Sequence, residues 1–323
     1  MKYIWVNGMM GIVVGDALGM PVQFADRAEL KYNPVKTMEG YGSYHMPPGT
    51  WSDDSSMALA TLDSIREKGE VDYSDIMERF FKWLFLGEYT PAGKAFDQGN
   101  TCVEAICKYV EGKDYRTCGK TGEMANGNGA LMRIMPACLY AYEKVLREEW
   151  DLKEALECVH QVSALTHNHL RSKMACGIYY FMIKNIIEGC GNLRERLQGG
   201  VDDAMRFYQE DVFNYVELVH YTRLLDLDEF AECKEDSIKS SGYVVDSLEA
   251  AVWGLITTNT LEECLLKVVN LGGDSDTIGA IAGGLAGLFY GYDSVPKEWR
   301  TQIIKEEKII ALCEVMEKKF EVR

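Results

Sequence analysis

Residues 277–291 read TIGAIAGGLAGLFYG, an apolar stretch in which every fourth residue from Gly279 onward is a glycine. A second stretch of this kind, GIVVGDALG, occupies residues 11–19 and has glycines at 11, 15 and 19. Glycines four apart lie on one face of an α-helix and let another backbone approach closely. Each costs roughly 1 kcal/mol relative to alanine inside a helix, so their repetition needs a packing reason. We therefore expect both stretches to be helices at the centre of the fold.

Helical periodicity also dominates the rest of the chain, whereas alternating, strand-like runs are few. The helices that this periodicity predicts cover residues 53–68, 73–86, 131–148, 152–165, 171–188, 247–257, 261–269, 277–290 and 297–319. Pro136 is expected to kink the helix that it enters. No change in composition divides the chain, so we predict an all-α fold in one domain over 1–323, with 190–245 as a peripheral excursion.

The composition is that of an ordinary globular protein, with 47% hydrophobic and 26% charged residues among 323. Acidic residues outnumber basic ones by 50 to 34, for a net charge of −16, which disfavours nucleic acid as a partner. Ten cysteines without a C-x-x-C pair indicate a reducing cytoplasm. The apolar N-terminal stretch is interrupted by Asn7 and Asp16, and no clean cleavage site follows it. We expect a soluble, unprocessed protein without a membrane partner.

Two short acidic segments lie far apart in the chain: WSDDSS at residues 51–56 and GGDSDT at 272–277. Each places two aspartates beside a hydroxyl residue and runs into a helical stretch. Four carboxylates brought together would repel one another unless cations lay between them, and oxygen ligands without Cys or His suit Mg²⁺, or Mn²⁺ in its place. If the segments meet, they form a two-metal site at one end of the helices. The alternative is that each segment only caps its helix.

Two loops have the composition of functional segments. Residues 31–50, rich in Pro and Gly, precede the first acidic segment and suit a lid or site wall. Residues 112–129 end in NGNG, and a glycine-rich loop that enters a helix offers N–H groups to a phosphate, although a plain connector fits the composition equally well. Gly119-Lys120-Thr121 is not a P-loop, because Asp114 stands where that motif needs glycine. His167-Asn168-His169 lacks Cys or His partners at metal-binding spacing.

Five motifs in order make the chain resemble the ADP-ribosylglycohydrolase family nearly from end to end. That family includes ADP-ribosylarginine hydrolases, ADP-ribosylserine hydrolases and the bacterial glycohydrolase that reactivates dinitrogenase reductase. The matching stretches are GIVVGDALGMPVQF (11–24), GTWSDDSSM (49–57), FDQGNT (96–101), GNGALMRIMP (127–136), and LTH (165–167) with NLGGDSDTIGAIAGGLAGLFYG (270–291).

The resemblance implies a compact orthogonal helical bundle with a binuclear Mg²⁺ site, and it transfers roles residue by residue. The implied metal ligands are Ser52, Asp53, Asp54, Asp274, Asp276 and Thr277. Asp97 matches a proposed catalytic base, and Asp54 and Asp276 belong to the catalytic centre with it. The implied ADP-ribose-binding residues are Gln23, Asp97, Gly99, Gly127, Asn128, Gly129 and His167. Asp16, in the matching N-terminal helix, is expected to support the site from behind the ligands.

One position departs from the family pattern. Many members carry glutamate after the D-A-L-G-x-P-V run, and this chain has Gln23. An amide cannot accept a proton as a carboxylate can, so a general-base role does not transfer to Gln23, although the amide can still orient a water or a ribose hydroxyl.

The leading hypothesis is Mg²⁺-dependent hydrolysis of the glycosidic bond that links ADP-ribose to a protein side chain or another acceptor. The Gln23 departure supports an alternative, a catalytically weak ADP-ribose-binding protein of the same fold. A metal-dependent diphosphate hydrolase rests on the two-metal pattern alone. The acceptor linkage, the oligomeric state and the physiological partner stay open at this stage.

Overall fold

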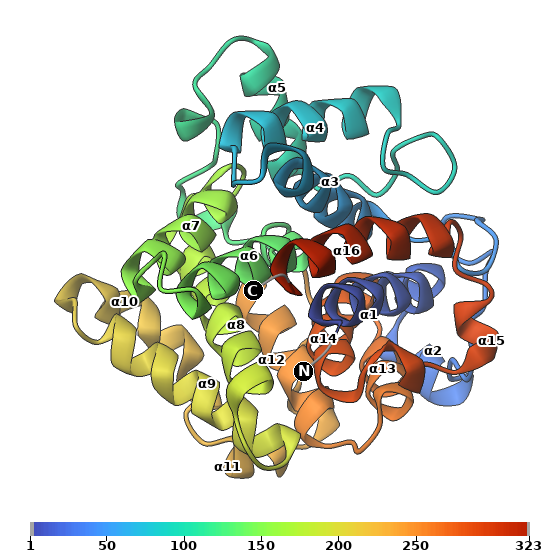
Figure 1. Cartoon of the computed structure of the whole chain (residues 1–323). Coiled ribbons are helices and arrows are strands. Elements are labelled where there is room, and N and C mark those ends of the chain that lie inside the picture. The colour runs from blue at the N-terminus through green and yellow to red at the C-terminus, as the bar shows by residue number, and fades with distance from the viewer. Residues whose placement is uncertain (1–2, 322–323) are drawn as a thin grey trace.

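The computed structural model describes residues 3–321 and is built of helices (Figure 1). The α-helices are α1 (Ile4–Gly19), α2 (Arg27–Tyr32), α3 (Asp53–Lys68), α4 (Tyr73–Leu86), α5 (Asn100–Val110), α6 (Met135–Leu146), α7 (Leu152–Ala164), α8 (Leu170–Glu188), α9 (Leu193–Tyr208), α10 (Tyr215–Leu218), α11 (Leu227–Ala231), α12 (Val244–Ile256), α13 (Leu261–Val269), α14 (Ser275–Tyr290), α15 (Lys297–Arg300) and α16 (Glu306–Glu321). Over the described residues there is no strand, only two isolated bridges, Lys120 with His167 and Gly127 with Tyr243. The predicted all-α class is confirmed.

The two glycine-rich helices, α1 and α14, lie side by side and antiparallel at the centre of the fold (Figure 1). A Cβ atom on Gly15 would lie 1.9 Å from the carbonyl oxygen of Gly279, and one on Gly11 would lie 2.1 Å from that of Gly283. The backbones therefore touch, and this contact is the packing reason that the glycine spacing required. Gly291 is different, because it ends α14 with φ of +83° and a Cβ there would meet nothing within 4 Å.

Two predicted helices are wrong in detail. The stretch 131–148 divides into a 3₁₀ turn, Leu131–Arg133, and α6 from Met135. Pro136 lies in the first turn of α6, where its missing N–H leaves no hydrogen bond broken, so it begins the helix and does not kink it. The stretch 297–319 divides into α15 and α16, because residues 301–305 form turns that end at Lys305 with φ of +61°.

The periodicity also missed helices, chiefly α5 and α9. The second lies inside 190–245 and packs along α8. It begins with a capping box, in which Asn192 accepts from the Glu195 N–H and the Glu195 carboxylate accepts from the Asn192 N–H. That pair was a readable sequence signal for a helix start.

The central helix α1 is apolar on all sides. Together with the following 3₁₀ turn it forms the stretch Ile4–Val22, the one part of residues 3–321 long and apolar enough to cross a membrane. Of its most apolar 18-residue window, 94% is buried inside the protein, as is typical of a helix in a protein core.

Candidate active site

The two acidic segments meet at the C-terminal end of α1. The carboxylate of Asp16 accepts hydrogen bonds from the Ser52 N–H at 2.9 and 3.0 Å and from the Ser55 N–H and hydroxyl at 3.0 and 2.6 Å. On the other side, the Ser275 hydroxyl donates to the carbonyl oxygen of Gly19 at 2.9 Å. The N-termini of α3 and α14 are therefore held against the same turn of α1, with their positive dipole ends toward the acidic cluster.

The carboxylates of this cluster are buried and close enough to repel one another. Burial, followed by the negative charges of Asp16 and Asp274, raises the pKa of Asp54 well above its ordinary value. Burial and the charge of Asp54 do the same to the pKa of Asp276, and burial with the charge of Asp97 raises the pKa of Asp53. A cluster with this much unfavourable charge is stabilised by any cation that it binds.

Several oxygen atoms in the cluster are available as metal ligands. Asp54 Oδ1 and Asp276 Oδ2 are buried and accept no hydrogen bond from the described chain. Asp16, Asp54 and Asp276 each offer a carboxylate oxygen within 4.8 Å of the others. Buried oxygens without donors are rare in proteins, and an all-oxygen set is what Mg²⁺ and Mn²⁺ select, so the residues present fit such ions.

Capping explains only part of this arrangement. Ser52 is the N-cap of α3, and its Oγ accepts from the Asp54 N–H at 3.4 Å while donating to Asp54 Oδ2 at 2.8 Å. Asp274 occupies the N-cap position of α14, but its side chain makes no capping hydrogen bond. It accepts instead from the amides of Asn128 at 2.6 Å and Gln23 at 3.4 Å, so it faces away from its own helix.

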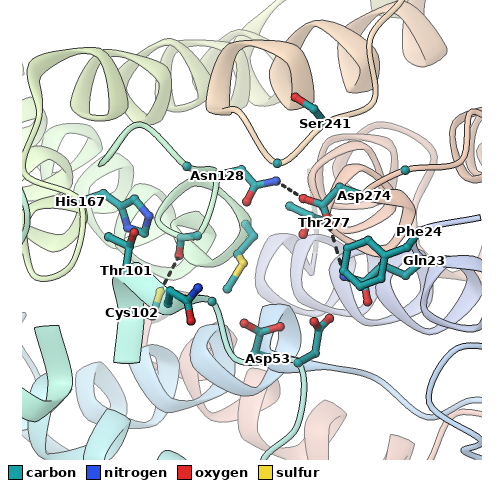
Figure 2. Close-up of a pocket in the computed structure, with 18 of the residues that line it drawn as sticks. Gln23, Phe24, Asp53, Thr101, Cys102, Asn128, His167, Ser241, Asp274 and Thr277 are labelled. Atoms are coloured by element: carbon teal, nitrogen blue, oxygen red, sulfur yellow. Dashed lines mark hydrogen bonds between the residues drawn. The ribbon is translucent and has the colours of Figure 1, made fainter. Parts of the chain in front are cut away.

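A cleft of about 390 Å³ adjoins the acidic cluster, whose Asp53 and Asp274 line it (Figure 2). His167, Thr101 and Cys102 lie on one side, and Gln23, Phe24 and Thr277 lie on the other, with Asn128 between them. The predicted site residues that line the cleft are Gln23, Asp53, Asp97, Gly99, Gly127, Asn128, Gly129, His167, Asp274 and Thr277. Ser52, Asp54 and Asp276 are at most 1% exposed and do not line it.

The glycine-rich loop is tied to a wall that the sequence did not indicate. The Asn128 N–H donates to the carbonyl oxygen of Gly242 at 3.0 Å, so it is not available to a phosphate as the loop composition suggested. The Asp274 N–H similarly donates to the carbonyl oxygen of Ser240 at 2.8 Å. Residues 240–242 thus line the cleft, and their only sequence signal was a run of small residues, Ser-Ser-Gly.

Asp97 lies at the cleft in a conformation that few residues adopt, with φ of +55°. Its Oδ1 accepts a hydrogen bond at 2.6 Å from the hydroxyl of Tyr44, which belongs to the predicted lid 31–50. Burial and the charge of Asp97 raise the pKa of Tyr44, so the phenol stays protonated as the donor. The segment 31–50 therefore reaches the cleft through this contact, which the sequence did not predict.

Comparison with known proteins identifies the family. The sequence model of the ADP-ribosylglycohydrolase family matches residues 6–323. The chain belongs to the ADP-ribosylglycohydrolase family. It is thereby an enzyme of the glycosidic-bond hydrolase class, as the resemblance of its motifs implied.

Individual relatives within this family cover most of the chain. An ADP-ribosylarginine hydrolase of Serratia proteamaculans is 31% identical over 95% of this chain and 77% of its own length. The ADP-ribosyl-[dinitrogen reductase] glycohydrolase of Rhodospirillum rubrum is 33% identical over 92% of this chain and 89% of its own. A solved ADP-ribosylglycohydrolase-related protein complex superposes with a TM-score of 0.77 at 28% identity, covering 98% of this chain and 97% of the other.

Proposed function

We propose that the protein releases ADP-ribose from an acceptor by hydrolysing the glycosidic bond at the distal ribose, and that it uses two Mg²⁺ ions, which Mn²⁺ can replace. The observation that carries this proposal is the meeting of the two acidic segments beside a cleft, with buried carboxylate oxygens that no donor satisfies. An ADP-ribosyl group is anionic, and a chain of net charge −16 needs cations or placed donors to hold it.

The proposed metal ligands are Ser52, Asp53, Asp54, Asp274, Asp276 and Thr277. Bound ions would polarise the ribose hydroxyls and a water, and would offset the repulsion among these carboxylates. Asp16 would act behind them, since its oxygens already accept from the serines that begin α3.

Residues along the cleft would bind the diphosphate and activate the attacking water. The diphosphate would lie beside Gly127, Gly129 and His167, which line the cleft. Asp97, which lines the cleft and accepts from Tyr44 through Oδ1, would orient or deprotonate the attacking water. The negative charge of the Asp97 carboxylate would stabilise an oxocarbenium-like ribose as the glycosidic bond breaks.

We propose an arginine guanidinium as the acceptor. Phe24 lines the cleft with its side chain 70% exposed, and a planar cation stacks favourably on such a ring. Two relatives, from Serratia proteamaculans and Pseudomonas putida, are named ADP-ribosylarginine hydrolases, at 31% and 29% identity.

The test measures free ADP-ribose released from arginine-linked and serine-linked ADP-ribosylated protein, with Mg²⁺ and with EDTA. We expect Mg²⁺-dependent release from the arginine-linked substrate, and loss of release in Asp54→Asn, which removes a ligand charge. Asp97→Ala should lower the rate by about 10²–10⁴-fold, the usual range for a general base. Full activity of Asp54→Asn would contradict the metal site, and release of AMP in place of ADP-ribose would indicate diphosphate hydrolysis.

The second candidate function, a weakly catalytic ADP-ribose-binding protein, rests on Gln23. Its Oε1 atom is buried and accepts no hydrogen bond within residues 3–321, and its amide cannot take a proton from water. Binding of ADP-ribose without release from either substrate would favour this reading, and Gln23→Glu should then increase the rate.

A further inference from the structure

Two residues of the matching motifs have no place in the cleft. Arg133, from GNGALMRIMP, and Thr166, from LTH, are both 0% exposed and line no part of it. Burying an arginine costs free energy unless its charge is paired or hydrogen-bonded, because desolvation disfavours the charged form. Its guanidinium lies over the ring of Phe80 at 4.7 Å, and its Nε and Nη1 atoms have no hydrogen-bond partner in residues 3–321.

A short chain of hydrogen bonds connects this arginine to the cleft. Arg133 Nη2 donates to Thr166 Oγ1 at 2.8 Å and to the carbonyl oxygen of Val162 at 3.3 Å. Thr166 Oγ1 lies 2.8 Å from Nδ1 of His167. The opposite ring edge of His167 faces the glycine-rich loop, since a Cβ on Gly127 would lie 3.4 Å from its Nε2 atom.

The hydrogens available along this series of hydrogen bonds favour one form of the imidazole. Arginine only donates, so Thr166 Oγ1 accepts from Arg133 and its own hydrogen is left for another acceptor. The Cys102 sulfur interacts with this hydroxyl but is a weak acceptor, whereas an unprotonated Nδ1 of His167 is a strong one. Only donation to Nδ1 gives the hydroxyl hydrogen a strong acceptor, so the arrangement favours an unprotonated Nδ1 with the ring hydrogen on Nε2.

We propose that Arg133 and Thr166 hold His167 in the Nε2–H tautomer, so that the neutral imidazole donates a hydrogen bond to an oxygen of bound ADP-ribose. The ligand in this statement rests on the proposed function. In the other tautomer a lone pair would face the phosphate oxygens and repel them. Burial, with the charges of Arg133 and Lys120, lowers the pKa of His167 to about 3, so the ring stays neutral at physiological pH.

The tautomer is measured directly by ¹⁵N NMR of the ring nitrogens, which is practical because the chain has 5 histidines. Loss of signals in His167→Gln assigns the residue. We expect wild type to show an unprotonated Nδ1 and a protonated Nε2 without any ligand. A protonated Nδ1 in wild type would overturn the proposal, whatever the variants do.

Thr166→Val removes the hydroxyl at nearly constant shape, so His167 should populate both tautomers. ADP-ribose binding should weaken about tenfold, the effect of one hydrogen bond to a charged group. Thr166→Ser should restore both the ring signals and the affinity, which a purely structural role would not require. Thr258→Val removes a distant threonine hydroxyl, bonded to the carbonyl of Gly254, and should change neither.

The two proposals fail in different ways. Unchanged ring signals and affinity in a folded Thr166→Val protein would overturn the positioning role of Arg133 and Thr166. The proposed hydrolase function would not be affected by that result. Absence of ADP-ribose binding to wild type, measured by calorimetry, would overturn the proposed function and with it the ligand of His167.

Discussion

At the scale of single residues, the cleft depends on a glycine that leaves room for the imidazole. A Cβ on Gly129 would lie 2.9 Å from Cε1 of His167 and 3.0 Å from Sγ of Cys102. Gly129→Ala should therefore displace the His167 ring and weaken ADP-ribose binding about tenfold, as loss of one charge-assisted hydrogen bond does. Calorimetric titration with ADP-ribose measures the change.

Gly122→Ala is the matched control for this substitution, because a Cβ there meets nothing within 4 Å and φ is −74°. It should bind ADP-ribose as wild type does. If Gly129→Ala binds equally well, the ring is not held where the structure places it.

At the scale of helices, the contact between α1 and α14 positions the acidic cluster. Gly15→Ala should lower the free energy of unfolding by about 3 kcal/mol, the upper part of the range for overpacking, because its Cβ would overlap the carbonyl oxygen of Gly279. Asp16 is the next residue, so the variant should also bind Mg²⁺ less tightly. Urea denaturation with and without Mg²⁺ measures both effects.

Gly8→Ala, in the same helix, tests whether the backbone contact is responsible. Its Cβ would meet the flexible side chains of Met135 at 3.2 Å and Leu288 at 3.4 Å. Because alanine also favours the helix, the stability should change by no more than about 1 kcal/mol. Equal losses in Gly8→Ala and Gly15→Ala would show that the helices are not in backbone contact at Gly15.

At the scale of the whole molecule, the acidic cluster makes stability depend on metal. In EDTA at neutral pH, Asp54→Asn should be at least as stable as wild type, because it removes one charge from a buried cluster whose pKa values are raised. Saturating Mg²⁺ should reverse the order by raising the Tm of wild type by several degrees, since a ligand at 100 times its Kd adds about 2.7 kcal/mol. Thermal unfolding scans of both proteins test this.

The sign of that reversal distinguishes the metal site from a plain capping role. If the aspartates only stabilised the positive ends of their helices, Asp54→Asn would be the less stable protein under both conditions. An equal Mg²⁺ shift in the two proteins would likewise contradict the site.

The features that the sequence predicted are those set by interactions between residues close together in the chain. Periodicity and glycine spacing are local, so they predicted the all-α class, the two central helices and the start of α3. The two acidic segments were found by their chemistry, and the other predicted site residues by resemblance to the family, whereas the cleft wall at 240–242 was not predicted. The break between α15 and α16 was missed, because turn residues such as Lys305 carry no periodic signal.

Tertiary structure alone decided which of these parts meet. That α1 packs directly on α14, that Asp16 accepts from the serines beginning α3, and that Tyr44 reaches Asp97 are contacts between distant segments of the chain. The hydrogen bond from the Asn128 N–H to Gly242 and the one from Arg133 to Thr166, behind His167, are also contacts of this kind. Such contacts depend on how whole helices pack against one another, and local residue patterns carry no information about that packing.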